Sequence, residues 1–559
     1  PLGFSIQTTY SPRFEWTNYL FHKAAASPDS GSQNGRVERT HTKDFYWQWD
    51  NMLKWNKTFG KHVFDFTFLA NWEKFQRWHD EMTNENFLPT DELGYGGIGF
   101  GTSPNVSSDD VYRTGDAFMG RLHYVYDQRY LITATVRRDG YSAFGLANPR
   151  ATFPAIALGW VFSEEKFLHR PDWFEYGKLR LSWGKNGNRA VGTYAAFMQL
   201  APRKYIYVDP ATGSLVTANT FYASTMANPN LKWESTTSWN IGTDLTFLKG
   251  RLSANLDVYK KITTDLLVSR ELPSLIGYSS VMSNIGEVQN TGVELSLNST
   301  NIRMDKLTWR TSFSLAYNKN KITHLYGIME DVKDADGNVI GQREADDIKN
   351  KRFIGHDIDE IWDYKVVGIW QEEEREEAAK YGQQPGDVHL LDKDMNYKYD
   401  NTDKEFQGTT MPRLRWSMRN DFTLFKNFNI SFNMYSYIGH KKTLGRFTND
   451  NALLNVTNQI KRDYWTPENR NNEYPRLANK KPAGVSYAIY KNASFLRFDN
   501  ISIGYTFPKK LIEPLRIQNL NVNATMKNAG YISGWPGYDP ENSDANTPRV
   551  IYFGINLTL

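Results

Sequence analysis

The chain has 559 residues, of which 40% are hydrophobic, 23% charged and 14% aromatic. It contains no cysteine, which excludes disulfide frameworks, thiolate metal sites and cysteine nucleophiles. The 66 basic and 62 acidic side chains leave a net charge of +4, too even for a protein that binds nucleic acid by electrostatics. A mean hydropathy of −0.60, with no apolar run of ~18 residues, excludes a helical membrane protein. The 17 Trp, 32 Tyr and 32 Phe in so polar a chain fit an antiparallel barrel with interfacial aromatic girdles.

Runs of about ten residues in which apolar and polar side chains alternate recur along the chain. They lie at 62–72, 118–126, 129–138, 237–247, 252–259, 292–298, 428–437, 500–507, 519–526 and 551–559. Within 237–247, for example, the polar Asn240 lies between Trp239 and Ile241. Adjacent side chains of a strand face opposite sides, so each run has one apolar and one polar face. We count roughly fifteen or sixteen such strands, which predicts an all-β, antiparallel fold.

The predicted strands are joined by connections of two very different lengths. Tight turns are expected at 57–62, 126–130, 247–251 and 425–429, and long loops at 77–114, 185–233, 320–412 and 440–492. Short periplasmic turns at one rim and long extracellular loops at the other are typical of an outer-membrane β-barrel. A soluble β-sandwich, which is the alternative, rarely sorts its loops so unevenly. The polar faces and the number of strands favour a wide barrel with a wet or plugged interior.

Several blocks of the chain resemble the SusC/RagA family of TonB-linked outer-membrane transporters. The clearest is RYLITATVRRDGYSAFGLANPRATFPAIALGWVFSEEKFL at 129–168. Further blocks in family order are SNIGEVQNTGVELSLN (283–298), AKYGQQPGDVHLLDKDMNYKYD (379–400), DYWTPENRNNEYPRL (463–477) and SFLRFDNISIGYTFPKKL (494–511). The end of the chain, from AGYISGWPGYDPE to YFGINLTL, completes the resemblance. It implies that residues 1–559 are the carboxyl-terminal part of a barrel of roughly 22 strands in the bacterial outer membrane.

The resemblance also implies a function and a set of partners. It implies active import driven through TonB, with a SusD-like surface lipoprotein that caps the long-loop rim and delivers the ligand. The family's amino-terminal extension, TonB-contacting box, plug and first strands are absent from this sequence, so we expect a missing amino-terminal barrel and plug segment to complete the barrel in lipid and lipopolysaccharide. The expected cargo is an oligosaccharide, with an oligopeptide as the alternative. A passive porin-like or structural barrel would use the same strands without energy coupling.

An acidic loop at 392–403 has the spacing of a calcium-binding loop. The candidate ligands, at positions 1, 3, 5, 7, 9 and 12, are Asp392, Asp394, Asn396, Lys398, Asp400 and Asp403. However, Tyr397 stands where such loops need Gly for a sharp turn, and position 12 is Asp instead of the usual bidentate Glu. Two interpretations therefore remain, a calcium site and a solvated acidic loop.

The predicted loops are rich in aromatic residues that could contact a sugar. Sugar rings present apolar C–H faces that stack on aromatic planes, while neighbouring polar groups bind hydroxyls. Each of these residues could equally pack within its own loop. The candidates are Tyr194, Tyr205, Tyr207, Tyr222, Tyr278 and Trp535, with Phe221 beside Tyr222.

Three further features predict no chemistry. The run QEEEREEAAKYG at 371–382 predicts a short solvated helix that ends at Gly382. The run GGIGFG at 96–101 lacks the Lys of a phosphate-binding loop and is expected to be a flexible loop. The ten His are scattered, and neither HExxH nor GxSxG occurs, so the sequence predicts that the protein is not an enzyme.

Overall fold

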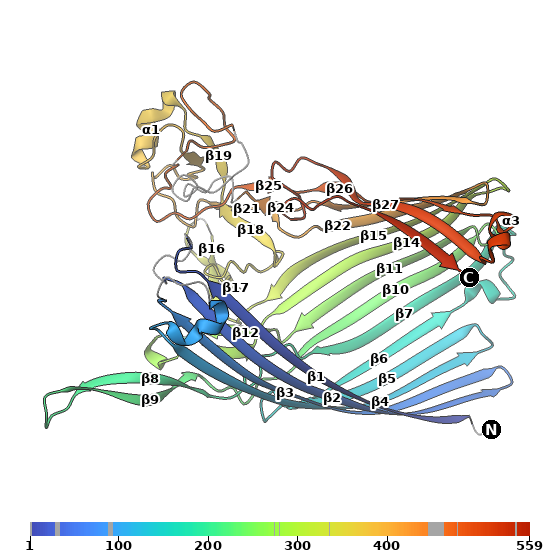
Figure 1. Cartoon of the computed structure of the whole chain (residues 1–559), viewed down its shortest axis with the longest axis horizontal. Helices are drawn as coiled ribbons and strands as arrows, with labels where there is room; N and C mark the ends of the chain where they lie inside the picture. Colours follow the sequence, from blue (N-terminus) through green and yellow to red (C-terminus); the bar gives the residue numbers. More distant parts are fainter. Residues whose placement is uncertain are drawn as a thin grey trace. The chain divides into compact units, whose positions relative to one another are not determined.

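The computed structural model describes residues 3–27, 34–87, 93–272, 274–278, 280–334, 336–444, 463–477, 479–542 and 545–559 (Figure 1). Its main element is one sheet of sixteen strands, in which each strand pairs with the next in the order of the chain. The described pairings of this sheet are antiparallel, which confirms the predicted fold class. None of the helices in these ranges is long and apolar enough to cross a membrane.

The strands of the main sheet are β1 (Phe4–Lys23), β2 (Arg36–Phe59), β3 (His62–Glu85), β4 (Asn105–Tyr126), β5 (Tyr130–Tyr141), β6 (Arg150–Trp160), β7 (Phe174–Asn188), β10 (Glu234–Phe247), β11 (Leu252–Thr264), β14 (Glu287–Arg303), β15 (Leu307–His324), β22 (Leu414–Leu424), β23 (Phe428–Ile438), β26 (Phe495–Thr506), β27 (Asn519–Ser533) and β28 (Val550–Thr558). Six two-stranded sheets lie in the connections: β8 (Gln199–Val208) with β9 (Leu215–Thr225), β12 (Leu267–Glu271) with β13 (Ser280–Asn284), β16 (Met329–Lys333) with β17 (Val339–Glu344), β18 (Glu360–Tyr364) with β21 (Lys404–Thr409), β19 (Val366–Ile369) with β20 (Val388–Leu390), and β24 (Lys441–Thr443) with β25 (Tyr490–Asn492). The helices of the described ranges are α1 (Arg375–Lys380) and α3 (Lys509–Ile512), with short 3-10 helices at η2 (Gly94–Phe100), η3 (Phe162–Glu164), η4 (Ser274–Ile276), η5 (Glu372–Glu374) and η7 (Glu513–Leu515).

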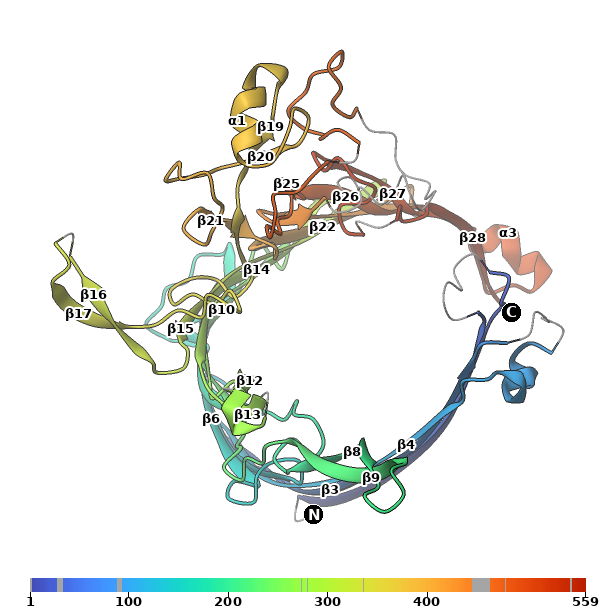
Figure 2. The same cartoon turned by 90° about the vertical axis from the view of Figure 1, so that its left-hand side faces the viewer.

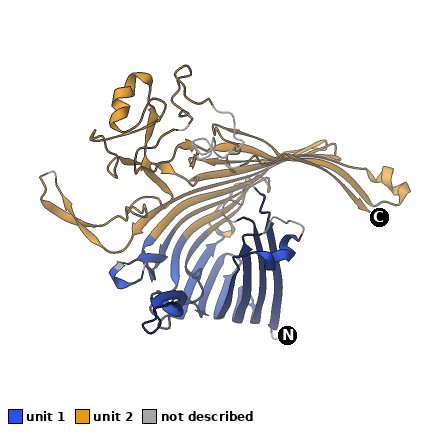
Figure 3. Ribbon diagram, turned by 60° about the vertical axis from the view of Figure 1, so that its left-hand side comes forward, with its two compact units in different colours: residues 1–161, 180–239, 261–287 blue, residues 162–179, 240–260, 288–559 orange. Residues whose placement is uncertain are grey.

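The chain divides into two compact units, which Figure 3 shows in different colours. Unit 1 comprises residues 1–161, 180–239 and 261–287, and unit 2 comprises residues 162–179, 240–260 and 288–559. Each unit contains a part of the main sheet together with the loops that its strands carry.

The register of unit 1 places aromatic side chains in two rows on one face of the sheet. The row beside the tight turns consists of Phe59, His62, Tyr126, Tyr130 and Trp160, which face one another across β2 to β6. The second row contains Tyr10, Trp49 and Trp72, which face one another across β1 to β3. His62 and Trp72 are ten residues apart on β3. The rows are therefore ~33 Å apart along the strand, or ~25 Å apart for a strand tilted by ~40°, which is the height of the apolar band of an outer-membrane barrel.

The tight turns form where the sequence predicts them. β2 and β3 are joined at Gly60, and β4 and β5 at residues 127–129. In unit 2, residues 248–251 and 425–427 make the corresponding turns. Three of the predicted turns, which are three or four residues long, contain two consecutive residues with positive φ, as the centre of a type I′ turn does: Asp127 and Gln128, Leu248 and Lys249, and Phe425 and Lys426. Such turns match the right-handed twist of the strands that they join.

Of the two long loops predicted in unit 1, the segment 77–114 is shorter than expected, whereas the segment 185–233 connects β7 to β10 nearly as predicted. β3 continues to Glu85 and β4 begins at Asn105, so that much of the segment 77–114 is strand. Residues 96–100 belong to the 3-10 helix η2 and Gly101 follows it with an extended backbone, so most of this segment is helical where the sequence predicted a loop. The segment 185–233 contains the β8–β9 hairpin. The strand portions 77–85 and 105–114 are mostly polar on both faces, so the apolar alternation on which the strand prediction depended is missing from them.

The long loops of unit 2 fold into a small body with its own core. The segment 320–412 supplies β16 to β21 and α1, which are at the loop end of the strands in Figures 1 and 2. The described part of 440–492 supplies β24 and β25, while residues 445–462 lie outside the described residues. Buried residues from both segments form one hydrophobic cluster, which includes Ile369, Val388, Leu390, Trp465 and Tyr487. The predicted helix is confirmed as η5 and α1, and Gly382 follows it with a φ of 69°.

Candidate functional site: a polar pocket on the face opposite the aromatic rows

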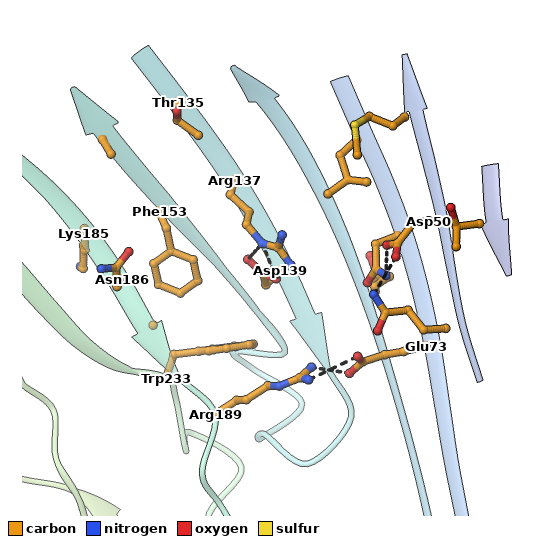
Figure 4. A pocket seen from close by; sticks show the side chains of 18 of the residues that line it. Asp50, Glu73, Thr135, Arg137, Asp139, Phe153, Lys185, Asn186, Arg189 and Trp233 are labelled. Carbon is orange, nitrogen blue, oxygen red and sulfur yellow. Dashed lines mark hydrogen bonds and ion pairs between the residues drawn. The ribbon is translucent and has the colours of Figure 1, made fainter. Parts of the chain in front are cut away.

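The polar face of unit 1 carries a pocket of about 830 Å³ (Figure 4). The wall of the pocket lies on the face opposite the aromatic rows, because adjacent residues of a strand face opposite sides. Asp50 and Asn71, for example, face each other at the wall and directly follow or precede Trp49 and Trp72 of the second row. The residues that line it are Gln7, Thr9, Gln48, Asp50, Met52, Leu69, Asn71, Glu73, Asp116, Thr135, Arg137, Asp139, Phe153, Ala155, Lys185, Asn186, Gly187, Arg189 and Trp233. Its volume is within the range of about 300–1,000 Å³ that is usual for small-molecule sites.

Asp50 is held at one side of the pocket by amide groups. The Nδ2 atom of Asn71, directly opposite on β3, donates a hydrogen bond of 2.7 Å to Asp50. The Nε2 atom of Gln48 donates a second bond, of 2.8 Å, and the hydroxyl of Tyr46 donates to Gln48 at 2.7 Å. Because three polar side chains orient this carboxylate, it is a fixed hydrogen-bond acceptor at the wall.

Most of the charged side chains at the wall belong to ion pairs. Arg189, in the connection after β7, pairs with Glu73 of β3, and its guanidinium also lies 5.0 Å from the ring centre of Tyr141. Arg137 and Asp139, two residues apart on β5, pair at 2.8 Å. Asp116 pairs with Arg150. Lys185 makes no ion pair with any residue of the described ranges.

The charges of the pocket therefore balance. The lining carboxylates are Asp50, Glu73, Asp116 and Asp139, and the cations are Arg137, Lys185 and Arg189, with Arg150 bound to Asp116. Four negative and four positive groups leave no net charge. A wall of this kind offers donors and acceptors to a polar solute without a field that selects for one sign of charge.

An aromatic corner closes one end of the pocket. Trp233 stacks on Phe144, with ring centres 4.7 Å apart, and meets Phe153 edge to face at 5.7 Å. A Cβ atom at position 187 would collide with the ring of Phe153, so Gly187 permits this close approach. Both lining rings are largely covered, Trp233 being 5% and Phe153 8% exposed. Their faces are thus unavailable for stacking, and the corner serves to shape the wall.

The aromatic residues selected from the sequence lie elsewhere. Tyr205 and Tyr207 are on β8, with ring centres 6.4 Å apart. Tyr222 is on β9, where it pairs with Ala201 of β8 and therefore lies on the same face of the hairpin. Their part in binding a sugar stays a prediction. The remaining members of the set are dispersed: the Tyr194 hydroxyl accepts a hydrogen bond from the backbone N–H of Tyr112, Tyr278 follows η4, and Trp535 is 6% exposed in the core of the unit 2 loops.

The acidic loop brings together three of its six candidate ligands. Carboxylate oxygens of Asp392, Asp394 and Asp403 lie within 4.8 Å of one another. The Asp400 carboxylate instead accepts hydrogen bonds from Thr402. The remaining amide candidate is engaged as well, because the Oδ1 atom of Asn396 accepts from the backbone N–H of Lys398 at 2.7 Å.

The converging carboxylates already have hydrogen-bond donors. Asp392 accepts from the Tyr381 hydroxyl and from the backbone of Tyr397, and Asp403 accepts from the backbone N–H groups of residues 393 and 400. Burial, followed by the bond to Asp392, raises the pKa of Tyr381. Desolvation and the neighbouring Asp392 raise the pKa of Asp394. Tyr397 adopts a φ of 65°, so the sharp turn for which the sequence lacks a glycine does occur.

The sheet, with aromatic rows on one face and a polar pocket on the other, defines the class of protein as an outer-membrane β-barrel. The chain belongs to the family described as TonB dependent receptor-like, beta-barrel, whose model matches residues 2–529. These findings confirm the SusC/RagA-type prediction and the location in the bacterial outer membrane.

Individual relatives agree with this assignment. The chain is 32% identical over 467 residues to the TonB-dependent receptor SusC of Bacteroides thetaiotaomicron, covering 79% of this chain and 43% of SusC. It is 28% identical to TonB-dependent receptor P3 of Formosa agariphila, covering 97% of this chain and 53% of that protein. The chain thus spans about half the length of the curated relatives it matches.

Among solved structures, the fold is similar to that of the RagAB peptide importer in its 'open-open' state. The TM-score is 0.78 at 20% identity, and the match covers 100% of this chain and 59% of that one. At this identity the likeness concerns the fold alone.

The pocket residues are the functional candidates that the sequence reasoning missed. Most of them lie at alternate positions of strands of the structure, but only Leu69, Asn71, Thr135 and Arg137 fall within the strand runs predicted from the sequence. The sequence contained one local signal for the pocket. A carboxylate occurs two residues away from an amide in Gln48 and Asp50, and two residues away from a guanidinium in Arg137 and Asp139. Such pairs share a face of the strand and can neutralise each other.

Proposed function

We propose that this chain forms wall and external loops of a TonB-dependent importer, and that its cargo is an oligosaccharide. The observation that carries the proposal is the charge-balanced pocket on the face opposite the aromatic rows. The aromatic rows suit a lipid interface on one side of the sheet, and the pocket suits passage of a polar solute on the other.

The chemistry of the wall favours an oligosaccharide as cargo. A sugar carries many hydroxyl groups and no net charge in its simplest forms, so it gains most from a dense set of fixed donors and acceptors. Asp50, with its amide neighbours, and the Arg137–Asp139 pair provide such groups. Weak, numerous hydrogen bonds also let a cargo leave again, as transport requires.

We further propose that a SusD-like surface lipoprotein covers the loop end and that TonB supplies energy by acting on a plug. The β8–β9 hairpin supports a partner at the loop end. Apolar side chains on one of its faces are exposed, including Leu200, Ile206, Val208, Leu215 and Phe221. An isolated two-stranded hairpin with exposed apolar residues is marginally stable in water, and a partner would cover these residues.

Two alternatives concern the cargo and the coupling. An oligopeptide is the second candidate cargo, since the RagAB peptide importer has a similar fold. A passive or structural barrel would use the same sheet without TonB. We propose no catalytic activity, because most charged groups of the pocket are held in ion pairs and amide hydrogen bonds, an arrangement suited to binding.

Deletion of the gene in its native host tests the proposal. We expect the deletion strain to lose growth on at least one oligosaccharide as sole carbon source, and a plasmid copy to restore it. A strain that lacks functional TonB should show the same loss, which separates active import from passive diffusion. Unchanged growth on every glycan and peptide tried would contradict the importer. If growth were lost on peptides alone, the cargo would be an oligopeptide instead of an oligosaccharide. Growth that is independent of TonB would favour the passive barrel.

A further inference from the structure

A second recess, of about 460 Å³, lies on the polar face of unit 2. Strands β14, β15, β22 and β23 form it. Its lining includes the small side chains of Ser314 and Ser417, which face each other across β15 and β22. The larger residues Leu295, Leu315 and Trp416 line it as well. Small residues at adjacent positions leave a hollow in a wall that is otherwise built from longer side chains. We call this hollow the tyrosine recess, after Tyr435 and Tyr437 at its side.

The two tyrosine rings of the recess are fixed in place. They alternate on β23, their centres are 5.6 Å apart, and both are partly exposed. Phe495 of β26 packs against both, with ring centres 5.8 Å from Tyr435 and 5.2 Å from Tyr437. The Tyr435 hydroxyl donates a 2.6 Å hydrogen bond to Glu541. Rings held in this way lose little conformational freedom when a ligand stacks on them.

Two charged groups border the rings and lack an ion pair. The Arg415 guanidinium lies 5.3 Å from the ring centre of Tyr437, which it faces across β22 and β23. Glu294 lines the recess from β14. Neither forms a salt bridge with a residue of the described ranges, unlike most of the charges at the pocket of unit 1. Their hydrogen-bonding capacity is therefore available to a ligand.

We propose that the tyrosine recess is a second binding subsite, which holds a hexose unit of an oligosaccharide. Tyrosine faces stack on the apolar C–H face of a pyranose, while a carboxylate and a guanidinium bind neighbouring hydroxyls. Serine hydroxyls of the lining can bind the far edge of the ring. The inference rests on the proposed import function and names the part of the wall that recognises the cargo.

Equilibrium binding to the purified full-length protein in detergent tests the subsite. The probes are maltohexaose and cellohexaose, which consist of hexose units, with hexaglycine as a peptide. We expect at least one hexasaccharide to bind, and Tyr437→Ala to weaken that binding about five- to tenfold through the loss of ring stacking. Tyr437→Phe should bind as tightly as the wild type, because no described residue is hydrogen-bonded to this hydroxyl and the ring remains.

Tyr317→Ala is the matched control. Tyr317 lies on β15, next to Ala316 of the recess, and its side chain is exposed on the opposite face of the strand. It should bind the hexasaccharide within about twofold of the wild type. Melting temperatures of the variants identify any loss of folding. Unchanged binding by Tyr437→Ala, binding of the peptide alone, or no hexasaccharide binding to the wild type would overturn the proposal.

Comparison with uptake separates this inference from the proposed function. If Tyr437→Ala binds normally while uptake requires TonB, the subsite is wrong and the importer stands. If hexasaccharide binding requires Tyr437 while uptake continues without TonB, the subsite stands and active import is wrong.

Discussion

Arg497 and Asp539 form an ion pair that is almost completely buried. The Arg497 side chain is 3% exposed and that of Asp539 1%. Arg497 extends from β26 and also contacts Glu541 at 2.6 Å. Glu541 in turn accepts a hydrogen bond from the Tyr435 hydroxyl. One arginine therefore fixes the loop after β27 and, through Glu541, a ring of the tyrosine recess.

Arg497→Met should strongly destabilise unit 2. The substitution leaves the Asp539 carboxylate buried without its partner, which costs about 3–5 kcal/mol in other proteins. We expect a lower melting temperature in detergent and faster proteolysis within residues 534–542. The additional substitution Asp539→Leu should recover part of the lost stability, since it removes the unpaired charge.

Arg419→Met is the control for this prediction. Arg419 pairs with Asp421, but the two side chains are 52% and 44% exposed. An exposed pair contributes less than about 1 kcal/mol. Equal losses of stability in the Arg419 and Arg497 variants would show that burial of the Arg497–Asp539 pair has no special role.

His440 should make stability depend on pH. Burial, together with the charges of Lys442 and Arg415, lowers the pKa of His440 to about 4, from 6.5 for a free imidazole. Between these values the unfolded chain binds a proton that the folded chain does not, so the free energy of unfolding falls as the pH falls from about 6.5 to about 4. Above this window the imidazole is neutral in both states.

His440→Gln should reduce this pH dependence. We expect its melting temperature to fall less than that of the wild type between about pH 7.5 and about pH 4.5, because the variant cannot take up the proton. Carboxylates titrate in the same range, so the quantity to compare is the fall in melting temperature of the wild type minus that of the variant. An identical fall in both would contradict the role of His440.

Cysteine labelling can map the two faces of β5, since the chain has no cysteine of its own. Thr135 lines the pocket, and the adjacent Val136 is 54% exposed on the other face. A Thr135→Cys variant should react with a water-soluble maleimide at least about tenfold faster than Val136→Cys, because a thiol in lipid neither ionises nor meets the reagent. Leu215→Cys, on the β8–β9 hairpin, provides the fully accessible control. Equal rates at positions 135 and 136 would contradict the assignment of the faces.

Calcium should leave the stability of the protein unchanged. Asp392 and Asp403 already accept hydrogen bonds, and the Asp400 carboxylate binds Thr402. We expect the same melting temperature with EGTA and with about 1 mM calcium, a concentration that extracellular calcium modules use. A rise with calcium that Asp394→Asn abolishes would instead establish the calcium interpretation of the loop.

The alternation of side chains made the barrel strands predictable from the sequence. In β5, for example, a polar residue such as Thr135 is followed by an apolar one such as Val136, and one face must meet lipid. The tight turns were predictable for a related reason, because each interrupts the alternation between two strands. Strand ends beyond the aromatic rows, such as residues 77–85 of β3, were not predictable, since both of their faces are polar.

The pocket and the tyrosine recess depend on which residues of neighbouring strands face each other, and this register could not be predicted from the sequence. Glu73 and Arg189 are far apart in the chain and meet only because the connection after β7 folds back toward β3. Trp535 was wrongly predicted for the same reason. It was expected to be available to a sugar as a loop residue, but the loops of unit 2 form a core that buries it. Packing between distant segments decided both outcomes.

The central claim is active import of an oligosaccharide, and the initial rate of uptake in intact cells tests it most directly. The probe is a fluorescent derivative of the oligosaccharide that supports growth of the wild type. The account predicts saturable uptake that a protonophore abolishes and that the deletion strain lacks. Uptake that continues at the same rate after the proton gradient is dissipated would contradict it.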